Sequence, residues 1–342
     1  MQKKILAVTM GDPNGVGGEV FLRSWQTLQN NGEDNIWLLL DDPSRVKSLI
    51  DFLAMNISIA VLHDPVAIKN FFIKKNNDLA ILPLKKNIPF YLGQVKNKND
   101  KYHAAEGTME SLDRAIDLVK KKIVHGMVTA PLDKSIMNSI VAGFRGHTDY
   151  LAEKDNKKNY AMMLLAEDDM VKSVFRTVPL TTHIPHRQVA TSLDNAKLTD
   201  AIKLVSSELQ KKFSIKKPRL AVAGINPHAG DNGIIGDEEI NIMIPVIKKL
   251  QKDGIDVDGP LSADSLFTSS MRKKYDVFLC PSHDQALIPI KTLFFDRAVN
   301  VTLGLSYIRV SPDHGTGFSI ADKKSANYQS MLSAMRLAKN LL

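Results

Sequence analysis

Cysteine is nearly absent from this chain, which has one such residue, Cys280, among 342. A single cysteine excludes an intramolecular disulfide, and it also excludes a structural zinc module built from closely spaced thiolates. Cys280 ends the apolar run that follows Asp276. That setting favours a buried strand position over a nucleophilic role.

Long apolar stretches are also missing. No run approaches the roughly 20 residues that a membrane-spanning helix needs. After Met-Gln-Lys-Lys the chain enters its first apolar strand, without the apolar segment of a secretory signal. We therefore expect a cytoplasmic protein that has no membrane partner.

Acidic residues are outnumbered, with 37 Asp and Glu against 45 Lys and Arg, so the formal net charge is +8. The lysines fall in scattered pairs within or beside helical patterns, with no aromatic interleaving and no nucleic-acid motif. This distribution argues against a nucleic-acid partner. A modest positive field still favours small anionic substrates.

Apolar strands alternate with amphipathic helices, which predicts an α/β fold with a largely parallel sheet. The apolar runs place strands at residues 4–9, 35–40, 126–129, 171–175, 219–223, 277–279 and 300–304. The helical patterns cover residues 19–29, 43–55, 105–122, 193–212 and 238–253. A chain of this length can form two lobes around a cleft.

A glycine-rich segment, Gly11–Glu19, follows the first strand but matches no standard nucleotide motif. It lacks the closing Gly-Lys-Ser/Thr of a phosphate-binding loop, and Val20 stands where a dinucleotide fingerprint has its third glycine. The segment is compatible with a tight turn or with a direct ligand contact.

Three of the nine histidines occur in distinctive settings: Thr-Thr-His183, Asn-Pro-His228-Ala-Gly and Ser-His283-Asp-Gln. Each follows a predicted strand, and ligands of open α/β sheets bind beyond the carboxyl ends of strands. Neutral imidazole is the commonest side-chain ligand of catalytic divalent metals, and three protein ligands leave positions open for substrate. The alternative is three unrelated surface histidines. We interpret His186 as such a surface residue.

Six linked motifs, in order along nearly the whole chain, resemble the 4-hydroxythreonine-4-phosphate dehydrogenase family of pyridoxal phosphate synthesis. The motifs are Met10–Glu19, Gly146–Glu153, Asn226–Gly230, Gly259–Asp264, His283–Gln285, and Val299–Gly304 continuing to Ser311–Thr316. The resemblance implies the two-lobed, three-layer α/β/α fold of isocitrate and isopropylmalate dehydrogenases, with the active site in the cleft between the lobes. We expect one lobe at 1–140 plus 305–342, and a second, carrying the metal ligands and dimer contacts, at 141–304.

The resemblance also assigns roles to individual residues. It implies metal binding by His183, His228 and His283, substrate binding by His147, Thr148, Lys291, Asn300 and Arg309, and catalytic support from Lys291, Asp264 and Asp284. The implied metal is usually zinc, with magnesium, manganese or cobalt as alternatives. The implied cofactor is NAD or NADP, whose contacts the sequence does not assign. Family members are homodimers whose active sites take histidines from both subunits.

The implied reaction is the oxidation of 4-phosphohydroxy-L-threonine to 2-amino-3-oxo-4-phosphooxybutanoate, which loses carbon dioxide to give 3-amino-2-oxopropyl phosphate. Two alternatives stay open: a related dehydrogenase acting on D-threonate or D-erythronate 4-phosphate, and a phosphate acyl- or acetyltransferase-like protein. Three metal-binding histidines count against the transferase. The sequence departs from the family pattern at Gly18, where proline is usual, and at Asp231-Asn232, where Glu-Gly is common.

Overall fold

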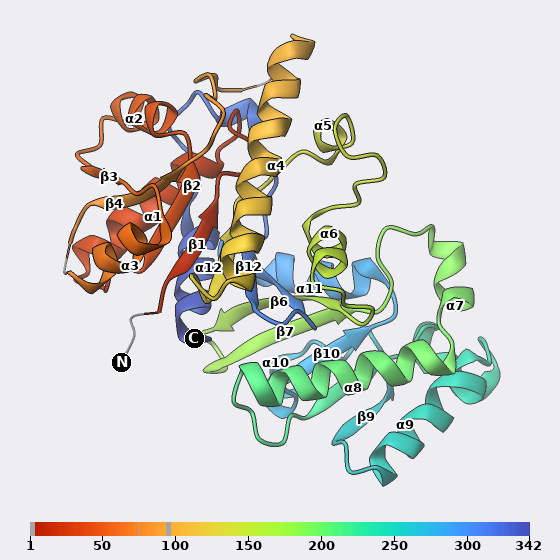
Figure 1. The fold of residues 1–342 in the computed structure, drawn as a ribbon. Coiled ribbons are helices and arrows are strands. Elements are labelled where there is room, and N and C mark those ends of the chain that lie inside the picture. Colours follow the sequence, from red (N-terminus) through yellow and green to blue (C-terminus); the bar gives the residue numbers. More distant parts are fainter. Residues whose placement is uncertain (1–3, 75, 94–96) are drawn as a thin grey trace. The chain divides into compact units, whose positions relative to one another are not determined.

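The computed structural model describes residues 4–74, 76–93 and 97–342 (Figure 1). The chain divides into two compact units, Met1–Asp155 with Ser306–Leu342, and Asn156–Leu305. Residues 141–155, which we expected in the second lobe, therefore group with the first unit. Each unit is an α/β structure, as the sequence predicts.

The first unit is built on a parallel sheet with the strand order β3-β4-β2-β1-β5-β12. Its strands are β1 (Leu6–Thr9), β2 (Trp37–Asp41), β3 (Ile59–Val61), β4 (Leu79–Pro83), β5 (Gly126–Thr129) and β12 (Ile308–Pro312). The central strands β1, β2 and β5 are fully buried. This burial explains why they are continuous apolar runs rather than alternating patterns.

Helices cover this sheet. They are α1 (Gly17–Asn30), α2 (Pro43–Phe52), α3 (Pro65–Ile73), α4 (Lys98–Lys120), α5 (Lys134–Met137), α6 (His147–Lys154), the short η4 (Phe318–Ile320) and α12 (Gln329–Asn340). The long gold helix α4 of Figure 1 packs on β1, β2 and β5 through an apolar stripe that includes Leu112 and Ala115. The helix α12 packs on β5 and β12 and against α1.

The second unit has a mixed sheet with the order β11-β6-β7-β10-β8-β9. Its strands are β6 (Ala161–Asp168), β7 (Ser173–Pro179), β8 (Leu220–Ala223), β9 (Val257–Leu261), β10 (Val277–Cys280) and β11 (Val299–Leu303). The strand β6 runs antiparallel to β7 and β11, whereas β7, β10, β8 and β9 are parallel. The largely parallel sheet is therefore interrupted at β6.

The helical segments of this unit are η1 (His186–Gln188), α7 (Val189–Ser192), α8 (Asn195–Lys212), η2 (Pro227–Gly233), η3 (Glu239–Met243), α9 (Ile244–Lys252), α10 (Ser269–Lys274) and α11 (His283–Phe294). Ala286, Ile290 and Phe294 of α11 pack into an aromatic cluster around Phe175 and Phe278. Cys280 is fully buried in the same cluster, and burial raises the pKa of its thiol. These properties fit the packing role predicted for Cys280.

The parallel strands β7, β10 and β8 are neighbours, so their carboxyl ends lie on one edge of the sheet. The segments that leave these ends carry Thr181–His183, Ser282–His283 and Asn226–His228. The strand order therefore directs all three histidine-bearing segments to the same edge. Among the helices of the described residues, none is long and apolar enough to span a membrane.

Candidate metal and substrate sites

His183 and His283 lie side by side, with ring centroids 5.7 Å apart and an interplanar angle of 40°. Main-chain bonding between their two segments sets this proximity. The Thr181 N–H donates to the Pro281 carbonyl at 3.1 Å, and the Thr181 hydroxyl donates to the same oxygen at 2.6 Å. Both rings line a pocket of about 130 Å³ whose wall also includes His186 and Asp284.

Asp284 joins two of these histidines. One carboxylate oxygen lies 2.8 Å from His283 Nδ1, and the other lies 3.4 Å from His186 Nε2. The hydrogen bond with His283 holds the pKa of Asp284 below its usual range, and a weaker contribution comes from His186. Asp284 thus fixes the ring orientation of His283, a common arrangement for a metal-binding histidine. His186 is exposed, as expected, but no sequence pattern indicated that it lines this pocket.

The spacing of the His183 and His283 rings suits two ligands of one ion. With a metal–nitrogen distance of about 2.0–2.1 Å, two imidazoles on a tetrahedral ion have ring centroids roughly 5 Å apart. The third candidate, His228, does not join them, because within the described part of this chain no three His, Cys, Asp or Glu side chains group closely enough to hold an ion. The chain therefore presents a two-histidine pair and a separate third histidine.

His228 lies on a left-handed turn. His228, Ala229, Asp231 and Asn232 all have φ between 43° and 57°, and Gly230 between them has a φ of 81°. Each non-glycine residue in this region costs roughly 1–2 kcal/mol, so the turn forms only where surrounding contacts impose it. His183 also has a positive φ, of 53°. Two of the three candidate ligands therefore occupy strained backbone, which is a frequent property of functional sites.

Asp264 lies beyond β9 and is exposed. A 2.5 Å hydrogen bond from the Ser262 hydroxyl lowers the pKa of its carboxyl, and the charge of His228 lowers it further. Asp264 is therefore associated with His228, whereas Asp284 is associated with His283. Asp284 thus hydrogen-bonds a candidate histidine directly, whereas Asp264 is held by the Ser262 hydroxyl.

Gln285 connects the segments that carry His283 and His228. Its side-chain oxygen accepts the Ser282 N–H at 3.1 Å, which forms a capping box at the start of α11. Its side-chain nitrogen donates to the Gly224 carbonyl at 3.0 Å, directly after β8. One side chain therefore fixes the N-terminus of α11 relative to the β8 segment.

The remaining predicted substrate residues of the second unit are Lys291 and Asn300. Lys291 is half-buried on α11, and Asn300 lies on β11. The Asn300 side-chain oxygen is buried and has no hydrogen-bond partner among the described residues. Because an unpaired buried acceptor is costly, this atom is a good candidate for a contact with a ligand.

The first unit gathers positive charge around Arg309. This side chain is 3% exposed, and its Nε and Nη2 atoms donate to the Thr129 hydroxyl at 3.1 and 2.7 Å. Burial lowers the pKa of Arg309 to about 10. Burial, followed by the charges of Arg309 and Lys134, holds the pKa of His147 well below its usual range. His147 is therefore neutral at pH 7 and can accept or donate a hydrogen bond.

Lys134 is a member of this group that sequence reasoning missed. Gly146, the N-cap of α6, has a φ of 138°, and a Cβ atom there would lie 3.6 Å from the Lys134 ammonium. Lys134 thus lies beside the start of α6, where His147 and Thr148 occupy the first turn. A helix N-terminus together with nearby cations favours an anionic group. Among 45 Lys and Arg, no local pattern distinguished Lys134.

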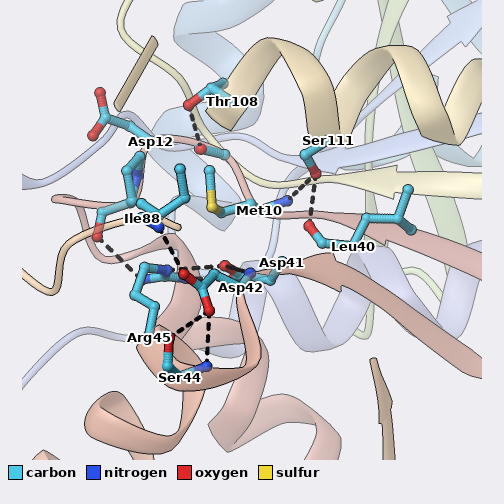
Figure 2. Close-up of polar contacts among 12 residues, drawn as sticks. Met10, Asp12, Leu40, Asp41, Asp42, Ser44, Arg45, Ile88, Thr108 and Ser111 are labelled. Atoms are coloured by element: carbon cyan, nitrogen blue, oxygen red, sulfur yellow. Dashed lines mark hydrogen bonds and ion pairs between the residues drawn. The ribbon is translucent and has the colours of Figure 1, made fainter. Parts of the chain in front are cut away.

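The glycine-rich segment is held by the network shown in Figure 2. The Thr108 hydroxyl donates to the Gly11 carbonyl at 2.7 Å, and the Arg45 guanidinium donates to the Pro13 carbonyl at 3.2 Å. Arg45 is buried together with Asp41, with which it forms a bidentate ion pair. The Asp12 carboxylate points away from Arg45 in Figure 2 and accepts the Asn14 N–H at 3.0 Å.

Comparison with known proteins places the chain in a family. Residues 36–338 match the family model described as pyridoxal phosphate biosynthetic protein PdxA. The chain belongs to the PdxA family. It is 38% identical to a 4-hydroxythreonine-4-phosphate dehydrogenase of Zymomonas mobilis, over 98% of this chain and 95% of that protein. The resemblance inferred from the six motifs is confirmed, and the chain is an oxidoreductase of this family.

Solved structures agree. The crystal structure of 4-hydroxythreonine-4-phosphate dehydrogenase from Klebsiella pneumoniae matches with a TM-score of 0.82 and 29% identity, covering 99% of each chain. A β-decarboxylating dehydrogenase from Thermococcus kodakarensis matches with a TM-score of 0.51 and 12% identity over 99% of this chain and 84% of that one. A branched-chain phosphotransacylase from Enterococcus faecalis matches with a TM-score of 0.54 and 11% identity over 98% of this chain and 99% of that one. The last two likenesses concern the fold alone.

Proposed function

We propose that this PdxA-family protein oxidises 4-phosphohydroxy-L-threonine to 2-amino-3-oxo-4-phosphooxybutanoate, which decarboxylates to 3-amino-2-oxopropyl phosphate. NAD or NADP accepts the hydride. Family membership supports the substrate, and the adjacent imidazoles of His183 and His283 support metal assistance. The enzyme works in the cytoplasm.

The residues that would hold a divalent metal are His183, His283 and His228. When bound, such an ion, zinc first and magnesium, manganese or cobalt as alternatives, supplies positive charge that stabilises the negative charge developing on the substrate hydroxyl oxygen. Asp284 orients the His283 ring, and Asp264 lies near His228. We assign the third histidine to the partner subunit of a homodimer, since His228 is separate from the pair within one described chain.

The substrate phosphate is bound by charge. Arg309 offers a planar fork of donors, which suits a phosphoryl group. Lys134 and the first turn of α6, with His147 and Thr148, add to the same positive region of the first unit. We also assign substrate contacts to Lys291 and to the buried side-chain oxygen of Asn300. We further assign to Lys291 the support of the proton transfer that accompanies hydride loss.

One experiment tests this function. Purified enzyme with NAD or NADP is offered 4-phosphohydroxy-L-threonine, D-threonate 4-phosphate and D-erythronate 4-phosphate in turn, and reduction is followed at the nicotinamide absorbance band. We expect turnover with the amino-acid phosphate and at most weak turnover with the sugar-acid phosphates. A preference for a sugar-acid phosphate would establish the related dehydrogenase instead. Acyl transfer between phosphate and coenzyme A, without nicotinamide reduction, would establish the transferase.

A further inference from the structure

The turn that carries His228 packs against one buried carboxylate, Glu239. This side chain is 1% exposed at the start of η3, eleven residues after His228. One carboxylate oxygen accepts the Asn226 main-chain N–H at 2.8 Å, and the other accepts the Asn226 side-chain N–H at 2.9 Å. Both oxygens are therefore used at Asn226, two residues before the left-handed turn begins at His228.

Glu239 also fits closely against the glycines on either side of His228. A Cβ atom at Gly230 would lie 2.8 Å from one Glu239 oxygen, and a Cβ at Gly224 would lie 3.2 Å from the other. The carboxylate thus occupies the inside of the loop from Gly224 to Gly230. His228 itself is exposed, so the ring points away from this buried contact.

We infer that Glu239 is a positioning residue that holds the left-handed turn and thereby presents the His228 imidazole to the metal. The inference rests on the proposed function and extends it, because Glu239 acts through Asn226 and is assigned no contact with metal or substrate. Supporting groups around metal ligands act in this way, by fixing the direction of the ligand before the ion binds.

The neighbouring Glu238 provides a matched control. It accepts the same Asn226 side-chain nitrogen at 2.7 Å, but with one oxygen and from a partly exposed position. Glu238→Gln keeps an oxygen for that bond. Glu239→Gln removes the same charge but replaces one of two required acceptors with a donor, so one hydrogen bond to Asn226 must be lost.

The test measures Co²⁺ binding by the intensity of its ligand-field absorption, with Zn²⁺ affinity from competition with a chelator. We expect Glu239→Gln to weaken metal affinity roughly 10- to 100-fold, the usual effect of removing such support, and Glu238→Gln to change it less than about threefold. Gly230→Ala, which places a methyl group against the carboxylate, should weaken affinity as well. Hydrogen exchange of residues 224–236, measured without metal, should become faster in Glu239→Gln and Gly230→Ala only.

Other outcomes would contradict either the positioning role of Glu239 or the proposed metal site. Unchanged metal affinity in Glu239→Gln would overturn the positioning role, whether or not exchange becomes faster. Equal losses in Glu238→Gln and Glu239→Gln would show a general effect of charge and would also overturn it. If His228→Ala binds metal as tightly as the wild type, the proposed metal site fails and the role of Glu239 fails with it. His228→Ala therefore separates the two failures.

Discussion

Asp12→Asn should make the first unit more stable at neutral pH, although it removes a charge from the glycine-rich segment. Asp12 is 3% exposed, and burial raises the pKa of its carboxyl from 3.8 to about 6, with Asp133 adding to the rise. The folded chain therefore binds this proton more tightly than the unfolded chain does. Stability is highest below about pH 3.8, falls as the pH rises to about 6, and is level above that.

The magnitude follows from this pKa. Since each pH unit corresponds to roughly 1.4 kcal/mol, holding the ionised carboxylate in the fold costs about 3 kcal/mol at pH 8. Asparagine keeps an oxygen for the Asn14 N–H and carries no charge. For a unit of roughly 150–250 residues, a gain of that size raises Tm by about 6–12 °C. At pH 4 the gain should almost vanish.

Differential scanning calorimetry of the wild type and Asp12→Asn at pH 4, 6 and 8 measures this effect, and Asp42→Asn is the control. Burial alone would raise the pKa of Asp42, but hydrogen bonds from Ser44 and from the Ile88 N–H outweigh burial and lower it. Asp42→Asn should therefore lower Tm, and more so at pH 8 than at pH 4. An Asp12→Asn variant that is no more stable than the wild type at pH 8, or whose gain in Tm is the same at pH 4, would contradict the raised pKa of Asp12.

Three further predictions concern the proposed function. The purified protein should contain about one divalent ion per chain by elemental analysis, and His228→Ala should lose both metal and turnover; full activity after exhaustive chelation would contradict this. A mixture of the inactive variants His183→Ala and His228→Ala should regain activity through hybrid dimers. A mixture of His183→Ala and His283→Ala should not, because the His183 and His283 rings lie in the same chain's pocket. A fully active monomer in light scattering would rule out the shared site. Arg309→Ala should lower kcat/KM for the phosphorylated substrate by about 30-fold to several thousand-fold with metal content unchanged, and Arg309→Lys should recover only part of that loss. Equal losses on 4-hydroxy-L-threonine would remove Arg309 from the phosphate site.

Sequence patterns predicted seven strands, among them the apolar runs Gly126–Thr129 and Val277–Cys280, which are bounded by turn residues, but they missed β3, β4, β9 and β12. The strand β6 was missed, since Ala161–Asp168 is rich in Ala, Met and Leu, which favour helices, and contains no β-branched residue. Its position between β7 and β11 comes from tertiary packing. The helix predicted over 238–253 is present as an unbroken run from 238 to 252. Its first part, η3, is π-helical, and α9 begins at Ile244 with Pro245 in its first turn.

The sequence selected candidate site residues but did not show how they group in the fold. Motif resemblance selected His183, His228 and His283 equally, yet the contacts that pair His183 with His283 depend on Thr181 reaching the Pro281 carbonyl. Bonds between segments a hundred residues apart leave no local pattern. The helix α11 was hidden for another reason, since Pro289 lies inside it and proline normally argues against a helix interior.

The first unit is discontinuous in sequence, and this order has a consequence for synthesis on the ribosome. The strand β12 pairs with β5, and the Val16 N–H donates to the Thr316 carbonyl, so residues near the end of the chain complete the sheet and the glycine-rich segment. The second unit, Asn156–Leu305, is translated before those residues. Since domains generally fold as units during translation, the second unit should be able to fold first. The sheet of the first unit can be completed only after β12 has been synthesised. Truncation after residue 305 should therefore destabilise the first unit more than the second unit.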